Sequence, residues 1–447
     1  MSEVLTSVGL DVGTTSTQMV VSQLQVENTA GAFAVPELQI TDRKVIYKGA
    51  VHFTPLLDES HVDGNRLRLL VEREYTLAGI SREQVDTGAV IITGETSRKE
   101  NAQTVLEAIS HLAGDFVVAV AGPDLESVLA ARGSGAADYA EKTGKTVLHM
   151  DIGGGTSNLA LIREGKIEAT GCLNVGGRLI RRDENNRVTY VSPVLGRYTS
   201  LKPGDRLTEA EEARIVTFLT EALEMASSLR PWQNSHRALL TEEASGLIPV
   251  LSERPVLSFS GGVADCIGKA YPANAFGDIG PALGRCIAQS RLCQGECRLG
   301  EETIRATVIG AGSHSTQLSG STVFHRNISF PLKNLPVVTL GDPEQVLPAQ
   351  ESLSVFSMEG LKTPSYREIA DMAEKLAPQL PDPAILCIRQ DMAKALGQAL
   401  ALRLPAYAGI LCIDRVRVGD GDYLDIGAPV GAAMPVVVKT LVLGRKE

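Results

Sequence analysis

One short pattern occurs twice in this chain: an apolar strand that ends in aspartate, a glycine-rich turn with hydroxyl-bearing residues, and a second apolar strand. The copies are SVGLDVGTTSTQMVV at residues 7–21 and LHMDIGGGTSNLALI at residues 148–162. Glycine gives a tight hairpin its backbone freedom, and backbone amides exposed in such a turn bind anions. One copy alone could be an ordinary hairpin turn. Two copies favour a pair of phosphate-binding hairpins.

Each hairpin combines an acid with hydroxyl groups and bare backbone, which is the chemistry that a metal-bound polyphosphate needs. Asp11 and Asp151 can hold Mg²⁺ through its water shell, because that ion loses water reluctantly. We expect backbone amides and hydroxyl groups of the turns to bind the phosphates of ATP or ADP; these residues are Gly13, Thr14, Thr15, Gly153, Gly154, Gly155, Thr156 and Ser157.

The segments that follow the two hairpins repeat one order of elements. After the first copy the patterns predict helices and strands at 44–53, 64–79, 88–94, 98–113 and 116–122. After the second copy they predict them at 165–173, 208–229, 255–262 and 303–312. A repeated unit headed by a phosphate hairpin predicts two similar α/β lobes around a nucleotide cleft. We place lobe I at residues 1–145 and lobe II at residues 146–330.

A third motif, Ser260-Gly261-Gly262, follows a predicted strand and opens a predicted helix. Glycines at such a junction let a purine or ribose lie against the backbone. The triplet is weak evidence alone. In third place after two phosphate hairpins, it predicts the adenosine-binding part of the same site.

Composition limits the partners. The net charge of -10 argues against broad binding to nucleic acid or to an anionic membrane, because both would favour a basic surface. The seven cysteines are an odd number spread over the chain, which argues against a secreted disulfide framework. No apolar run approaches the length of a membrane span, and no signal peptide is expected. These features predict a cytoplasmic protein.

At this point the chain resembles the actin-like ATPase superfamily, whose lobes are ribonuclease H-like. The resemblance makes Asp11 to Thr15 the first phosphate motif, Asp151 to Thr156 the second, and Ser260 to Gly262 the adenosine motif. It also implies two short hinge helices between the lobes, at residues 125–135 and 311–320.

The resemblance narrows to one family. The stretches VGLDVGTTSTQ, IITGETSRKENA, DIGGGTSNLALIREGKI and CLNVGGRLI, with the tail DGDYLDIGAPVGAAMPVVVKTLVL, look like the ethanolamine ammonia-lyase reactivating factor (EutA) family. This implies an ATP-dependent chaperone that releases damaged cobalamin from inactivated ethanolamine ammonia-lyase, so that intact adenosylcobalamin can bind. A bacterial microcompartment and a homo-oligomer are also compatible with it.

One departure concerns the acid that positions water for ATP hydrolysis. Heat-shock relatives carry a glutamate before a proline at the start of the first hinge helix, whereas this chain has Gly122-Pro123. Glu95 at the tip of the strand at 88–94 is the first candidate, and Asp124 is the second. Glu95 could instead cap the helix that is predicted to begin near Arg98.

The segment 331–447 is predicted to form a small third α/β unit, because Pro-rich stretches frame a strand–helix–strand pattern at residues 384–413. It could brace a lobe or dock the client. Two other functions stay open: a small-molecule kinase, for which no sugar pocket is evident, and a filament-forming ATPase, which would need self-complementary faces.

Overall fold

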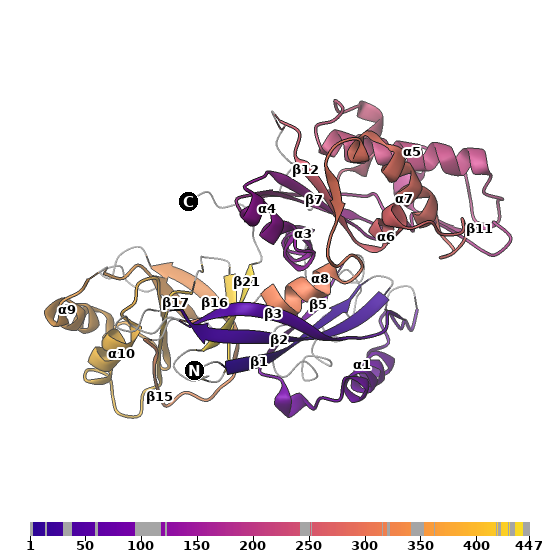
Figure 1. Ribbon diagram of the computed structural model, residues 1–447. Coiled ribbons are helices and arrows are strands. Elements are labelled where there is room, and N and C mark those ends of the chain that lie inside the picture. The colour runs from indigo at the N-terminus through magenta and orange to yellow at the C-terminus, as the bar shows by residue number, and fades with distance from the viewer. Residues whose placement is uncertain are drawn as a thin grey trace.

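A computed structural model gives the fold of this chain. It describes residues 3–13, 16–29, 38–58, 61–93, 118–120, 123–241, 251, 253–314, 316–319, 322–340, 353–361, 363–416, 418, 422–427, 429 and 434–440. Three bodies are visible: two lobes, one above the other, and a third unit beside the lower lobe (Figure 1).

Lobe I is built on a six-stranded sheet in the order β3-β2-β1-β5-β6, with β4 paired to β2. Its strands are β1 (Glu3–Val12), β2 (Ser16–Asn28), β3 (Leu38–Lys48), β4 (His52–Phe53), β5 (Thr87–Ile92) and β6 (Val118–Val120). Helix α1 (Gly64–Ala78) begins at Asp63, whose side chain caps the amide of Arg66, and ends at Gly79 in the left-handed conformation. The predicted helix at 98–113 lies outside the described residues.

Lobe II is built on a five-stranded sheet in the order β13-β12-β7-β8-β9. Its strands are β7 (Val147–Ile152), β8 (Ser157–Arg163), β9 (Lys166–Leu173), β12 (Val256–Ser260) and β13 (Cys297–Leu299), with a small hairpin of β10 (Ile180–Arg182) and β11 (Val188–Val191). Helices α5 (Glu209–Ala226), α6 (Gly262–Gly268) and α7 (Gly280–Gln289) belong to the same lobe, with short 3-10 turns at Pro193–Leu195, Asn234–Leu239 and Arg291–Cys293. Their apolar residues form the lobe's core with the sheet.

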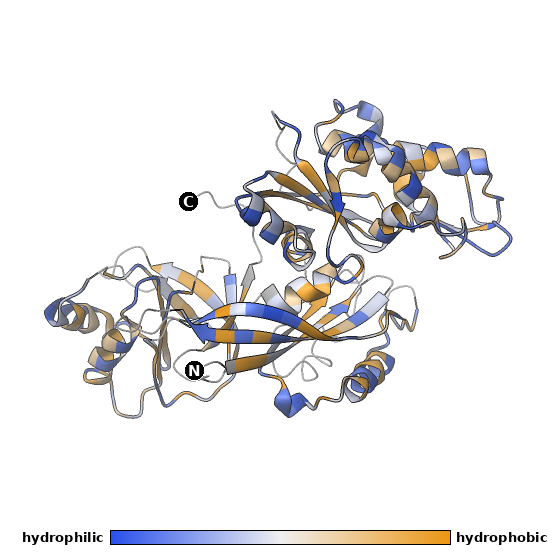
Figure 2. Cartoon of the chain, in the orientation of Figure 1, coloured by the Kyte–Doolittle hydropathy of each residue, from blue (hydrophilic) through white to orange (hydrophobic). Residues whose placement is uncertain are grey.

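The two sheets have the same topology. In each, the hairpin strands and the third strand pair antiparallel, a later strand pairs parallel to the first strand, and the last strand pairs parallel to that later strand. The predicted duplication is therefore confirmed, as is the α/β class with two similar lobes. Hydrophobic residues are concentrated on the strands and on one side of the helices (Figure 2), as expected for sheets buried by helices.

Two short helices cross between the lobes, and each packs on the sheet of the other lobe. Helix α3 (Pro123–Gly133) follows lobe I but contacts β8 and β9, and it continues into α4 (Ala136–Thr143). Helix α8 (Ala306–Ile309) and a π turn (Gly310–His314) follow lobe II but contact β1 and β2. A Cβ on Gly133 would overlap the carbonyl oxygen of Ala306, and one on Gly310 would overlap that of Leu129. Only bare backbone lets the two helices come this close.

The predicted strand at 303–312 is wrong, because this segment forms α8 and the π turn, and β13 occupies the sheet position instead. The run Thr303 to Ile309 is rich in β-branched residues, and its buried members are Ala306, Val308 and Ile309. A short apolar run of this kind does not distinguish a strand from a buried helix. The second crossing helix therefore begins before the predicted 311–320, and residues 316–318 form a strand.

The third unit contains an eight-stranded sheet in the order β14-β21-β20-β16-β17-β18-β19-β15. Its strands are β14 (Thr316–Leu318), β15 (Phe324–Arg326), β16 (Leu332–Leu340), β17 (Val355–Met358), β18 (Ala384–Ile388), β19 (Ile410–Asp414), β20 (Asp422–Ile426) and β21 (Pro435–Thr440). Helices α9 (Tyr366–Leu376) and α10 (Ala393–Ala401) pack on it. This confirms the strand–helix–strand pattern at 384–413. Two strands of this sheet come from before residue 331, and the three residue ranges assigned to the domains stay a prediction. Among the helices described, none has the length and apolar content needed to cross a bilayer.

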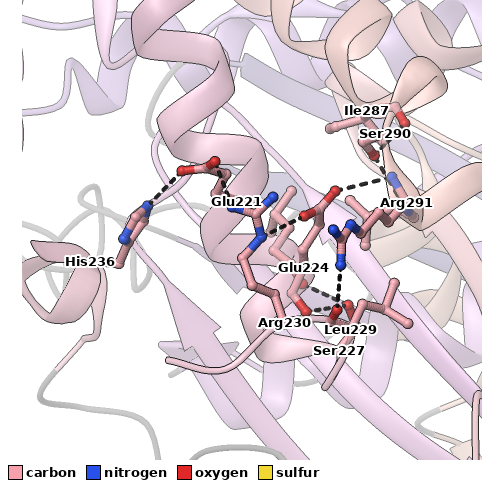
Figure 3. Close-up of polar contacts among 11 residues, drawn as sticks. Glu221, Glu224, Ser227, Leu229, Arg230, His236, Ile287, Ser290 and Arg291 are labelled. Atoms are coloured by element: carbon pink, nitrogen blue, oxygen red, sulfur yellow. Dashed lines mark hydrogen bonds and ion pairs between the residues drawn. The ribbon is translucent and has the colours of Figure 1, made fainter. Parts of the chain in front are cut away.

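A cluster of ion pairs and hydrogen bonds links the C-terminal end of α5 to Arg230, His236 and Arg291 (Figure 3). Arg230 bridges Glu221 (2.6 Å) and Glu224 (3.1 Å), and Glu221 lies 3.5 Å from the Nε2 atom of His236. Glu224 also accepts a hydrogen bond from the backbone amide of Arg291 at 3.0 Å. Its side chain is 5% exposed against 28% for Glu221. The buried glutamate therefore satisfies two donors that solvent would reach poorly.

We expect Glu224→Ala to destabilise lobe II by about 1–3 kcal/mol, because it leaves a buried amide and part of a guanidinium unpaired. The matched change Glu221→Ala should cost less than about 1 kcal/mol, since its ion pair is partly solvated. The chain has one tryptophan, Trp232, which packs against the same core. Urea unfolding followed by its fluorescence measures both variants; equal losses would contradict this ranking.

Candidate functional site

The two predicted hairpins are closed in the same way. In the first, the amide of Gly13 donates to the carbonyl of Ser16 at 2.9 Å, and in the second, that of Gly153 donates to Thr156, also at 2.9 Å. Both loops therefore span four residues between paired strands. The aspartates stand two positions before each loop, where Asp11 pairs with Gln18 and Asp151 pairs with Asn158.

Both loops open into one cavity between the lobes, with a volume of about 610 Å³. This size is typical of small-molecule sites. Its lining comes from both lobes and from the crossing helices. Among the described residues it includes Asp11, Gly13, Ser16, Gln18, Phe53, Thr93, Glu126, Asp151, Gly153, Gly154, Gly155, Thr156, Asn158, Arg178, Gly261, Gly262, Asp265, Tyr271, Phe276, Asp278 and Thr307.

Most of the predicted site residues that the structure describes line this cavity. Thr14, Thr15 and Glu95 lie outside the described residues. The phosphate role predicted for Ser157 is corrected, because its side chain is fully buried and donates to the carbonyl of Val175 at 2.7 Å. Successive side chains of a strand point to opposite faces, so Thr156 faces the cavity and Ser157 faces the core.

The two aspartates are half-buried carboxylates, and both face the cavity. Thr93 donates to Asp11 at 2.8 Å, and the hydroxyl of Ser260 donates to Asp151. The pKa of Asp11 is raised to about 7, mainly by burial and to a smaller extent by the charge of Asp151, while the Thr93 hydrogen bond opposes the shift. Burial likewise raises the pKa of Asp151 to about 6 against the hydrogen bonds from Ser260 and Thr307.

Ser260 itself lies behind the cavity and not in its lining. It is fully buried at the end of β12 and reaches the site only through Asp151. Its two glycine neighbours do line the cavity. Gly261 has a φ of 86°, and an added Cβ would overlap the carbonyl of Ile152. Around Gly262 an added Cβ would meet nothing within 4 Å. This bare backbone at the start of α6 leaves room for a ligand to approach.

The cavity is strongly acidic. Five carboxylates line it, and Arg178 is the one lysine or arginine among its described lining residues; the acids are Asp11, Glu126, Asp151, Asp265 and Asp278. A polyphosphate alone would be repelled by such a lining. Oxygen ligands in this number suit a hard divalent cation, so the residues present fit Mg²⁺ bound together with a nucleotide.

The carboxylate that α3 contributes to the cavity is Glu126, which the sequence analysis did not consider. It is 8% exposed and accepts a hydrogen bond from the Nδ2 atom of Asn158 at 2.7 Å. Asp124, the residue predicted instead, accepts a hydrogen bond from Thr170 on β9 and is not among the described lining residues. Two residues apart on a helix means opposite faces, so only one of these acids can point into the cavity.

Arg178 was also missed. Its amide donates to the carbonyl of Gly154 at 2.7 Å, which fixes it beside the second hairpin loop. Its Nε atom lies 3.3 Å from Asp278, and its guanidinium lies 5.8 Å from the ring centre of Phe53 in lobe I. The Gly-Gly-Arg run at 176–178 was a possible signal, since a glycine pair there permits this close packing.

Comparison with known proteins identifies the family of this chain. The model of the family described as ethanolamine utilisation protein EutA matches residues 3–444. Proteins named ethanolamine ammonia-lyase reactivase EutA, from Salmonella typhimurium and from Escherichia coli, are each 37% identical to this chain and align over 98% of both chains. Among solved structures, a Ppx/GppA phosphatase from Aquifex aeolicus has a TM-score of 0.41 and 14% identity, covering 69% of this chain and 99% of its own. The ethanolamine utilization protein EutJ from Carboxydothermus hydrogenoformans has a TM-score of 0.34 and 18% identity, covering 68% and 88%. The family match and the relatives span nearly all of this chain, which therefore belongs to the EutA family.

Proposed function

We propose that this chain is an ATP-dependent reactivating chaperone of adenosylcobalamin-dependent ethanolamine ammonia-lyase. In this role it releases damaged cobalamin from the inactivated lyase, so that intact cofactor can bind. The names of its full-length relatives support the client. A cytoplasmic location, a microcompartment and a homo-oligomer stay predictions.

One observation carries the nucleotide part of the proposal. Two hairpins of identical closure, each with a half-buried aspartate, face one cavity from opposite lobes. We infer that the amides of Gly154 and Gly155 bind phosphate oxygens, together with Gly13, Thr14 and Thr15. Asp11 and Asp151 would hold Mg²⁺ through water. Bound there, the ion would neutralise charge on the phosphates.

The other residues of the cavity have roles in this scheme. Arg178 supplies the positive charge for a phosphate from the lobe II side. Glu126, held by Asn158, orients the attacking water and accepts a proton from it. Gly261 and Gly262 place the adenosine against α6. ATP contacts with both lobes favour a closed cavity, and loss of phosphate removes some of them, so the lobes open.

Asp151→Ala should weaken the binding of Mg-ATP at least about tenfold, or about 1.4 kcal/mol. It should change metal-free ADP binding much less, because the carboxylate acts through the ion. Asp124→Ala is the matched control, since that aspartate lies outside the cavity lining. Calorimetric titration with and without EDTA measures both ligands. An equal loss for both would contradict the metal role of Asp151.

Glu126→Gln should leave ATP binding nearly intact and slow hydrolysis about 10²-fold or more, the usual range for a lost general base. Asp124→Asn should hydrolyse ATP at the wild-type rate. Glu95→Gln tests the candidate that lies outside the described residues. A slow Glu95→Gln beside a normal Glu126→Gln, in a single-turnover phosphate-release assay, would assign the water-positioning role to Glu95.

Nucleotide should change the affinity for the client, and the client should change the affinity for nucleotide by the same factor. A useful switch needs a factor of about 5–150. This factor is measured by titrating cobalamin-inactivated lyase against Glu126→Gln, first with ATP and then with ADP. The variant should also fail in multiple-turnover reactivation. Identical affinities in the two nucleotides would remove the proposed coupling.

A further inference from the structure

A fully buried histidine lies directly behind the metal-binding aspartate. His149 stands on β7, two residues before Asp151, and is 0% exposed. Its neighbours are three serine hydroxyls: Ser258 lies 3.1 Å from Nδ1, while Ser260 and Ser134 lie 2.8 Å and 3.3 Å from Nε2. In the parallel register of β7 and β12, His149 pairs with Ser258 and Asp151 pairs with Ser260. Neither the catalytic scheme above nor the core packing accounts for this polar chain.

The hydrogen bonds of the neighbours assign one tautomer to His149. Ser260 donates to Asp151, and Ser134 donates to the carbonyl of Ala131, so each hydroxyl oxygen accepts from His149. The shared donor must be the Nε2–H group, which leaves Nδ1 as an acceptor for the Ser258 hydroxyl. Every member of this series of hydrogen bonds then has a partner. The donors all point in one direction, from Ser258 through His149 and Ser260 to the carboxylate of Asp151.

His149 does not act on a ligand directly, because it is absent from the described residues that line the cavity. Its hydrogen bonds give the ring one donor at Nε2 and one acceptor at Nδ1.

The same series of hydrogen bonds also extends to the end of the crossing helix α3. Ser134 directly follows α3 and is fully buried, and its carbonyl accepts from the amide of Glu301 at 2.9 Å, in the segment that leads to α8. One hydrogen bond of the histidine thus points toward the carboxylate, and a second, longer one points toward the junction where both crossing helices meet lobe II.

We propose that His149 is a positioning residue: it orients the Ser260 hydroxyl that holds the Asp151 carboxylate, and through Ser134 it links that carboxylate to the end of α3. This inference rests on the proposed nucleotide function. It predicts that the contribution of Mg²⁺ to ATP affinity depends on a donor at the Nε2 position. It also predicts that Mg-ATP binding is transmitted to α3 through Ser134.

The test uses two substitutions of similar polarity. The amide nitrogen of glutamine reaches about as far as Nε2, whereas that of asparagine reaches only to the position of Nδ1. In the full-length protein, His149→Asn should reduce the gain in ATP affinity on adding Mg²⁺ about tenfold, as should Ser260→Ala. His149→Gln should keep most of this gain. All three should bind metal-free ADP within about twofold of wild type, as measured by calorimetric titration.

Ser134→Ala tests the link to the helix. Its Mg-ATP affinity should stay within about twofold of wild type, but the change in amide hydrogen exchange of residues 123–135 on adding Mg-ATP should be lost. If His149→Asn and His149→Gln lose the Mg²⁺ gain equally, in step with their melting temperatures, the histidine is a packing residue and the proposal is overturned. If Mg²⁺ does not increase the ATP affinity of the wild-type protein, the proposed metal role of Asp151 is wrong, and this inference is overturned with it. An unchanged exchange response in Ser134→Ala would overturn the link to α3.

Discussion

The structure depends on two half-buried carboxylates that stand at the heads of two separate sheets and face one cavity. Asp11 and Asp151 each gain a hydroxyl donor, yet burial still raises the pKa of both. Such a pair is unfavourable as two charges and becomes favourable when a divalent cation neutralises it. Five carboxylates and one arginine are found among the described lining residues, and this excess of negative charge also favours a bound cation. In the proposed function, the cavity therefore binds a polyphosphate best as its metal complex, and nucleotide binding would then control how the lobes face each other.

The crossed helices explain how such control could reach the whole molecule. Each helix follows one lobe and packs on the other, so relative motion of the lobes must pass through their contact. That contact is backbone on backbone at Gly133 and Gly310, which leaves no side chain to absorb a shift. Close-packed contacts of this kind favour discrete arrangements over gradual deformation. Glu126 and Thr307, one on each helix, also face the cavity. The pivot and the site therefore share residues.

Much of the fold follows from local pattern. The two Asp-Gly hairpins, the order of strands after them and the strand–helix–strand unit near residue 400 were predictable, because alternation, turn residues and caps act over a few positions. The segment 303–312 was not, because its apolar side chains suit both a strand and a helix wedged between two lobes. Its conformation depends on contacts with Gly9, Leu129 and Gly133, which lie more than a hundred residues away.

The candidate site also combines features that local sequence determines with features that depend on the tertiary structure. The sequence by itself determined the paired glycine hairpins, their aspartates and the glycine junction after β12, since each is a local motif that depends on neighbouring residues. Only the tertiary structure decided that Glu126 and not Asp124 faces the cavity, that Ser157 faces the core, and that Arg178 is the one arginine or lysine among the described lining residues. These outcomes depend on which face of a helix or strand is turned to the other lobe. That orientation is set by packing between segments far apart in the chain, and no local pattern carries it.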